Sequence, residues 1–142
     1  MTIDELNRIS SLPDVLSKKQ LEEEFKLLLN AMQQEPKRDQ NLAIMSALFE
    51  LAERQWATYE LLASEIKEKI EELILKIWDQ NDLDSTEKLV GTIAHLGLSK
   101  AFSVLILTDP KDLNSEIRTE IASAIVEFGD NVSDPYSGMR GT

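Results

Sequence analysis

Apolar residues recur along the chain at the spacing of an α-helix, and short polar segments separate the recurring runs. The clearest run lies between Ser115 and Gly129, where apolar side chains fall at i, i+4, i+7, i+8 and i+11 and form one stripe. Ser115 is suited to be an N-cap, and Gly129 to end the helix in a left-handed conformation. Ala122 and Ala124 are small enough to let a neighbouring helix approach closely. The segment therefore predicts a complete helix that stacks on others.

Six other segments are predicted to be helical, and β-branched alternation typical of half-buried strands is absent. Thr2 with Glu5, and Ser17 with Gln20, form capping-box patterns at two helix starts. Gly97 is suited to end a helix. The sequence thus predicts an all-α fold of about seven helices. The expected helices are a short one that begins at Thr2 and longer ones over residues 17–34, 39–55, 59–78, 85–96, 99–108 and 115–128, with Ser85 as the cap of the fifth.

Two regions need separate interpretation. Residues 99–108 are strongly apolar and partly β-branched, so a strand is conceivable, but the short flanking turns favour a helix buried between neighbours. Residues 130–142 are rich in Gly, Ser, Pro and Asp and lack periodicity. We expect a single helical domain over residues 1–129 and an irregular tail over 130–142, either loose or lying along the surface.

Two parts of the chain share one arrangement of residues. Residues 88–97 form an apolar helical segment that ends in Gly97, and a shorter apolar segment then leads to Asp109-Pro110. Residues 117–129 repeat the first of these segments. This skeleton resembles the HEAT repeat, in which helix pairs stack because no pair can bury its apolar face alone. The resemblance implies antiparallel helix pairs in a short α-solenoid, although residues 39–78 fit such a pair only loosely.

The charge of the chain narrows the classes of partner. Lys and Arg total 15 against 26 Asp and Glu, a net charge of −11 that is spread along the whole length. This charge repels nucleic-acid backbones and anionic membranes, and it accelerates encounter with basic proteins. A surface that is acidic only for solubility is an equally good explanation of the charge alone.

Other absences bear on location. The chain has no Cys, which fits a reducing compartment and excludes disulfides and thiolate chemistry. It has no apolar run long enough to span a membrane, and its acidic start is unlike a signal peptide. We expect a cytoplasmic protein.

The sequence offers little chemistry. His95 is the single histidine, which rules out a histidine-based metal site and leaves a solvent-facing bystander as the favoured interpretation. Asp79, Asp82, Asp84 and Glu87 form the densest acidic cluster outside a helix face, but the spacing lacks the central Gly of a calcium loop. A capping and solubilising turn is favoured for this cluster, ahead of a docking patch for a basic partner and then a metal site. We expect no cofactor and no catalytic residues.

Small acidic helical-repeat proteins of this kind resemble the immunity proteins of bacterial polymorphic toxin and contact-dependent growth inhibition systems. The stretch from Gly129 to Tyr136 after the last helix is similar to the ends of one such family. The resemblance implies a non-catalytic protein that binds one cognate toxin domain and blocks its active site or its activation. It carries no individual binding residue over to this chain.

Charge and exposure suggest which residues contact such a partner. An acidic helical surface can cover a basic toxin domain that acts on nucleic acid or hydrolyses nucleotides. Trp56 and Trp78 stand at helix ends, where tryptophan packs at a core boundary or anchors an interface. The alternative functions are an acidic adaptor or scaffold subunit of a cytosolic complex and, third, an enzyme. The predicted partner-binding residues are Asp79, Asp82, Asp84, Glu87, Glu50, Glu53, Glu60 and Tyr136.

Overall fold

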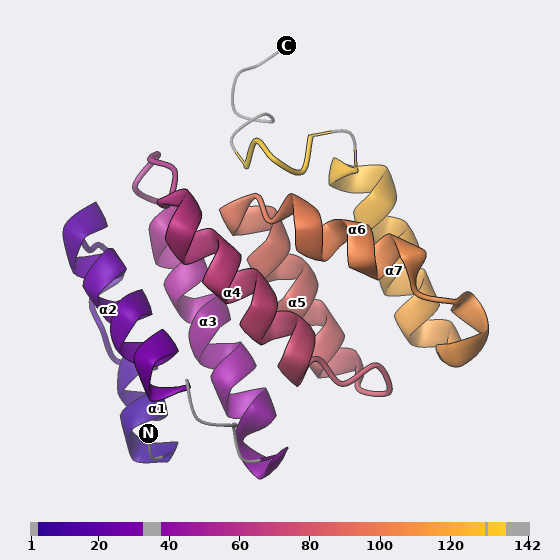
Figure 1. Cartoon of the computed structure of the whole chain (residues 1–142), viewed down its shortest axis with the longest axis horizontal. Coiled ribbons are helices and arrows are strands. Elements are labelled where there is room, and N and C mark those ends of the chain that lie inside the picture. The colour runs from indigo at the N-terminus through magenta and orange to yellow at the C-terminus, as the bar shows by residue number, and fades with distance from the viewer. Residues whose placement is uncertain (1–2, 33–37, 130, 136–142) are drawn as a thin grey trace.

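The computed structural model describes residues 3–32, 38–129 and 131–135, and within them every regular element is a helix. The described part contains seven α-helices and two short 3₁₀ turns (Figure 1). These are α1 (Ile3–Ser10), α2 (Lys18–Ala31), η1 (Arg38–Gln40), α3 (Asn41–Trp56), α4 (Ser64–Ile77), α5 (Leu83–Leu96), α6 (Ser99–Leu107), η2 (Pro110–Asp112) and α7 (Ser115–Phe128). The all-α prediction and its number of helices are confirmed.

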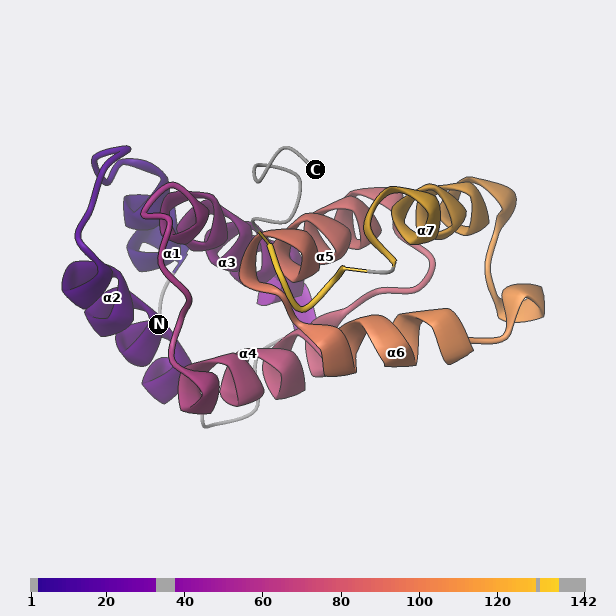
Figure 2. The same cartoon turned by 90° about the horizontal axis from the view of Figure 1, so that it is seen from above.

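The helices form two layers. Seen from above, α1, α3, α5 and α7 lie side by side in one layer, and α2, α4 and α6 form the other (Figure 2). Neighbours within each layer contact one another, and α2, α4 and α6 also pack against helices of the layer opposite. This arrangement is the short helical solenoid that the repeated segments predict, because each added pair buries the apolar side left open by the pair before it.

Local signals set most of the helix ends. Ser17 accepts a hydrogen bond from the Gln20 amide and the Gln20 side chain accepts one from the Ser17 amide, which confirms the predicted capping box of α2. Gly97 ends α5 at φ +70°, in the left-handed region that glycine adopts without a steric penalty. The predicted cap Thr2 lies outside the described residues.

Three predicted helix ends are wrong. Asp82 rather than Ser85 caps α5, because its carboxylate accepts from the amides of Asp84 and Ser85 and the helix begins two residues earlier. Asn114 rather than Ser115 caps α7, since its side chain accepts from the Ile117 amide. Gly129 keeps a right-handed conformation (φ −56°, ψ −35°), and its amide still donates to the Ile125 carbonyl as in a continuing helix.

The start of α4 also differs from the prediction. The helix begins at Ser64 and not at residue 59, because residues 57–60 are folded into a turn. The Thr58 hydroxyl donates to the Gln55 carbonyl, and the Gln55 side chain donates to the Glu60 carbonyl. Leu62 is nevertheless buried, so the loop also contributes to the core.

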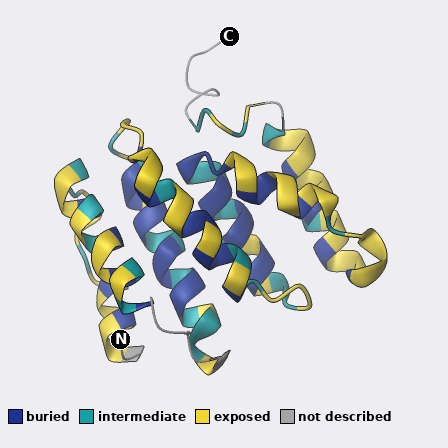
Figure 3. Ribbon diagram, viewed as in Figure 1, coloured by how far each residue is buried: buried dark blue, intermediate teal, exposed yellow. Residues whose placement is uncertain are grey.

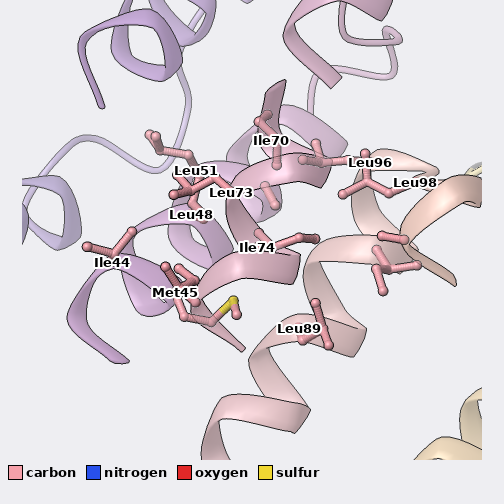
Figure 4. Packing of buried hydrophobic residues seen from close by; sticks show 14 of the residues in the cluster. Ile44, Met45, Leu48, Leu51, Ile70, Leu73, Ile74, Leu89, Leu96 and Leu98 are labelled. Carbon is pink, nitrogen blue, oxygen red and sulfur yellow. The ribbon is translucent and has the colours of Figure 1, made fainter. Parts of the chain in front are cut away.

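The core lies between the two layers and is richest around α3, α4 and α5 (Figure 4). Burial is correspondingly uneven: α3 and α5 are buried on most sides, whereas α2, α4 and α6 keep broad exposed faces (Figure 3). Central helices of a stack have neighbours on more sides than peripheral ones, which explains this difference. The labelled core residues are Ile44, Met45, Leu48 and Leu51 from α3, Ile70, Leu73 and Ile74 from α4, and Leu89, Leu96 and Leu98.

The prediction that residues 99–108 are buried between neighbours is only partly correct. Ala101, Phe102 and Leu105 are buried against α4, α5 and α7. Leu107, by contrast, is 82% exposed, and Val104 and Ile106 are about half exposed. The reason is the position of α6 at the end of its layer, where no further helix covers its other sides. Within the described ranges, no helix is both long and apolar enough to cross a membrane.

Buried polar side chains tie successive helices together. The Arg54 guanidinium of α3 donates to the carbonyls of Leu12 and Pro13 and to the carboxylate of Glu50. Glu71 of α4 is 7% exposed, and its Oε2 accepts from the Ala101 amide at 2.7 Å. Ala101 is the third residue of α6, and the residue before that helix, Leu98, has no side chain that can cap it. Glu71 therefore acts as the N-terminal cap of α6 from a different helix.

The cap from Glu71 leads to a stability prediction. Glu71→Ala leaves the Ala101 amide without its acceptor and is expected to lower the free energy of unfolding by about 2 kcal/mol. Glu71→Gln keeps an acceptor oxygen and should cost less than about 1 kcal/mol. Urea denaturation measures both, with the exposed neighbour Glu72→Ala as a control that stays within about 0.5 kcal/mol of the parent. Equal losses for the Ala and Gln variants would contradict this role.

Candidate protein-binding surface

The closest helix packing in the molecule creates an exposed surface. α3 has its most extensive contact with α5. The Phe49 ring of α3 lies directly on Gly91 of α5, where an added Cβ would overlap ring carbon Cε2. Gly91 is therefore the residue that allows this contact. Phe49 meets Gly91 and Trp56 meets His95, so the two helices run in the same direction.

We call the outer side of these two helices the α3–α5 face. On α3, Phe49, Glu53 and Trp56 share one side because they lie four and three residues apart. On α5, the same spacing places Asp84, Lys88, Gly91 and His95 on one side. The residues of the α3–α5 face are Phe49, Glu50, Glu53 and Trp56 from α3, the adjoining Tyr59, and Asp84, Glu87, Lys88, Gly91 and His95 from α5.

A row of aromatic rings follows the centre of the α3–α5 face. The rings of Phe49 and His95 lie 5.9 Å apart between centroids, those of His95 and Trp56 5.6 Å, and those of Trp56 and Tyr59 6.5 Å. Lys88 Nζ lies 5.6 Å from the Phe49 centroid, close enough for a cation–π contact. Phe49, Trp56 and His95 are half-buried, and Tyr59 is 66% exposed. Half-buried aromatic side chains of this kind are the typical anchors of protein interfaces.

Tyr59 is held in an unfavourable backbone conformation. Its φ is +60°, and it is the one non-glycine residue of the described chain in the left-handed region. The Tyr59 amide donates to the Trp56 carbonyl, and the Glu60 amide donates to the Thr58 hydroxyl, so the surrounding turn enforces this geometry. Strained residues of this type gather at functional sites. A tyrosine at a position that suits glycine therefore points to a role for its side chain.

His95 is not the solvent-facing bystander that the sequence suggests. It is half-buried between Phe49 and Trp56, and desolvation by burial lowers its pKa below the ordinary value of 6.5. The neutral imidazole is thus the form that packs in the aromatic row. The helical wheel of α5 alone could not show this, because the rings that cover His95 come from α3.

Carboxylates flank the aromatic row on both sides. Glu50 and Glu53 lie on the side toward α1, around a hollow of about 210 Å³ that Asp14 and Arg54 also line, and Arg54 pairs with Glu50 at 3.0 Å. Glu87 is exposed on the opposite side, and Asp84 Oδ1 lies 3.4 Å from Lys88 Nζ. The structure therefore brings four predicted residues onto one face with the aromatic rings: Glu50, Glu53, Asp84 and Glu87.

The other predicted residues lie elsewhere. Asp79 and Asp82 belong to the turn before α5, beside a polar hollow of about 470 Å³ that Asp39 and Lys76 also line. Asp79 Oδ1 accepts from the Asn81 amide and Asp82 caps α5, so both shape the turn, as the capping interpretation predicts. These two residues lie toward the N-terminal end of α5, away from the row.

Two predicted residues remain, Glu60 and Tyr136. Glu60 is exposed in the turn next to Tyr59, at the C-terminal end of α3. Tyr136 lies outside the described residues. In the part of the chain that the structure covers, no three side chains of His, Cys, Asp or Glu are arranged to hold a metal ion.

The aromatic row is the feature that sequence reasoning missed. Phe49 and Trp56 lie seven residues apart on one side of α3, and Gly91 interrupts an otherwise regular helix. An isolated glycine inside a helical pattern often marks close packing, so this signal was present. The sequence carries no signal for the pairing of α3 with α5, because this pairing depends on the tertiary arrangement.

No protein-family model matches the chain, and neither a curated protein nor a solved structure is significantly similar to it.

Burial of His95 predicts a pH dependence of stability. The folded-state pKa is lower than the unfolded value of 6.5, so the unfolded chain binds the proton more readily. The contribution of neutral His95 is present above about pH 6.5 and is lost as the pH falls through that value toward the folded-state pKa. His95→Gln lacks this loss, so the difference in Tm between parent and variant should shrink between pH 8 and pH 5. A folded-state imidazole pKa at or above 6.5, measured by NMR on this single histidine, would contradict the prediction.

Proposed function

We propose that the α3–α5 face binds a basic partner protein and that the chain acts by binding and not by catalysis. The observation that carries this proposal is the aromatic row between flanking carboxylates. Interfaces concentrate their binding energy in central aromatic residues, and charged residues at the rim accelerate and orient association. Trp56 and Tyr59 supply anchors of this type, and Glu53 and Glu87 supply the rim.

The charge of this face selects the partner. A guanidinium or ammonium group gains from stacking on Trp, Tyr or Phe and from a nearby carboxylate. The net charge of −11 extends the attraction beyond contact distance and raises the association rate. An acidic partner would meet repulsion from Glu53 and Glu87, which are both exposed. A basic domain is therefore the occupant that this chemistry supports.

Within this class, we propose an immunity protein that neutralises a cognate bacterial toxin domain. The support is the acidic helical-repeat architecture together with the resemblance of the chain to such proteins. A toxin that cleaves nucleic acid or hydrolyses nucleotides binds an anionic substrate, so its active site is basic. Carboxylates beside partly exposed aromatic rings are suited to cover such a site in place of the substrate.

Co-expression tests this function. The protein is produced together with the toxin domain encoded by the adjacent gene, and growth and complex formation are measured. Rescue of growth and a stoichiometric complex are expected, with an association rate that falls as salt rises. Absence of both rescue and complex would overturn the immunity proposal. A complex with a protein that is not toxic would instead support an adaptor.

A charge-swap pair locates the interface. Glu53→Lys with Glu87→Lys is expected to weaken toxin binding about tenfold or more, because two rim carboxylates become like charges of the partner. The control is Glu65→Lys with Glu72→Lys on the exposed side of α4, which changes the net charge by the same amount in the opposite layer. Titration calorimetry compares the two. Equal losses would mean that net charge, and not the α3–α5 face, determines binding.

The strain at Tyr59 predicts that stability and binding separate. Tyr59→Gly relieves a conformation that costs a non-glycine residue about 1–2 kcal/mol, and the extra freedom of glycine in the unfolded chain offsets about half of this gain. The Tm should therefore stay equal or rise, while toxin affinity falls about tenfold with the loss of an aromatic anchor. Tyr59→Phe keeps the ring and should retain most of the affinity. A Tyr59→Gly variant that binds as the parent does would remove Tyr59 from the interface.

A further inference from the structure

After its last helix, the chain returns to the C-terminal ends of α3 and α5 (Figure 2). Beyond α7, the Asn131 amide donates to the Phe128 carbonyl and the Asp134 amide donates to the Asn131 carbonyl, so two turns fold the chain back. The returning segment, residues 131–135, lies over the C-terminal end of α5 (yellow in Figure 1). We call it the C-terminal strap.

Gly97 makes room for the strap. A Cβ at Gly97 would lie 3.0 Å from the Ser133 carbonyl oxygen, 3.2 Å from the Val132 carbonyl oxygen and 3.2 Å from Pro135 Cδ. The strap backbone therefore rests on the bare backbone of Gly97. The lack of a side chain at Gly97 thus matters twice, because the residue also ends α5 in the left-handed conformation, at φ +70°.

The strap ends on the aromatic row. Trp56 Nε1 donates a hydrogen bond of 3.1 Å to the Pro135 carbonyl oxygen. Val132 is half-buried against the core, whereas Asn131 and Ser133 are exposed. The strap has no helix and little buried apolar surface, and segments of this kind open locally at low cost in free energy.

We propose that the strap competes with the basic partner for Trp56. This inference rests on the proposed function, because it concerns access to the same face. With the strap closed, the Trp56 indole N–H donates to the Pro135 carbonyl oxygen and is not available to a partner. With the strap open, the Trp56 indole N–H no longer donates to Pro135 and can donate to a partner instead. The apparent association constant is thus the intrinsic one multiplied by the fraction of molecules in which the strap is open.

Two substitutions in the full-length protein are designed to loosen the strap without changing the net charge. Gly97→Asn keeps a residue that tolerates the left-handed conformation but places a Cβ against the strap backbone. Val132→Ser removes the apolar contact of the strap. The matched control is Val126→Ser, the same chemical change at a position of α7 that is 88% exposed.

Hydrogen exchange at the two indole N–H groups reports closure directly. Trp56 N–H exchange should accelerate about tenfold in Gly97→Asn and Val132→Ser, but not in Val126→Ser. Trp78, whose Nε1 donates to Thr86 Oγ1, is the internal reference and should not change. Unchanged exchange at Trp56 in both release variants would overturn the strap, whatever the function of the face.

Binding of acetyl-hexa-arginine amide tests the competition. This cationic probe should bind the release variants about threefold to tenfold more tightly than the parent or Val126→Ser. Equal affinities together with faster Trp56 exchange would overturn the competition. If no variant binds the probe or the toxin domain, the proposed function fails, and the exchange rates alone then decide whether the strap shields Trp56.

Discussion

The fold and its candidate site both depend on the contact between the Phe49 ring and Gly91. The ring occupies the space that any side chain at position 91 would fill, so the Phe49 ring packs directly on the backbone of α5. This contact sets α3 and α5 side by side in one direction. It consequently brings Trp56 next to His95, and it leaves Phe49 in the row that faces outward. A larger residue at position 91 would disturb the packing and the surface together.

The remaining helices support this pair through polar links as well as apolar burial. Arg54 ties α3 to the segment before α2, and Glu71 ties α4 to the start of α6. A buried charged group that loses its partner is costly, so these links favour one arrangement over alternatives in which helices slide along one another. The aromatic row thus lies on helices held from both directions of the stack.

Local signals were sufficient to predict the fold, but not the site. The capping box at Ser17 and the left-handed stop at Gly97 depend on a few adjacent residues, and both appear in the structure as predicted. Tyr59 illustrates the opposite case. It continues the helical periodicity of α4, yet the hydrogen bonds of Thr58 and Gln55 fold it into a turn. Competing side-chain to backbone bonds of this kind are not visible in periodicity.

The candidate site was predicted only in its charges. Acidic side chains on helix surfaces are recognisable one at a time, and four of the eight predicted residues indeed share the α3–α5 face. The aromatic row combines rings from α3 and the turn after it with His95 from α5, so the sequence of one helix alone does not reveal the row. The prediction that His95 faces solvent is wrong for the same reason. The rings that cover it, Phe49 and Trp56, belong to α3 and do not appear in the pattern of α5.

The parallel course of α3 and α5 also concentrates negative potential at one corner of the molecule. Each helix carries roughly half a negative elementary charge at its C-terminal end, and these two ends lie side by side near Trp56 and Gly97. Glu53 and Glu60 add full charges beside them. The two residues with left-handed backbone in the described chain, Tyr59 and Gly97, follow these same helix ends. Because α3 and α5 both end here, the chain turns after each of them. The first turn places the exposed Tyr59 next to Trp56, and the second places Gly97, on which the strap rests, close to the same tryptophan. The corner at which two helix C-termini and two carboxylates meet is therefore also the corner that the strap reaches.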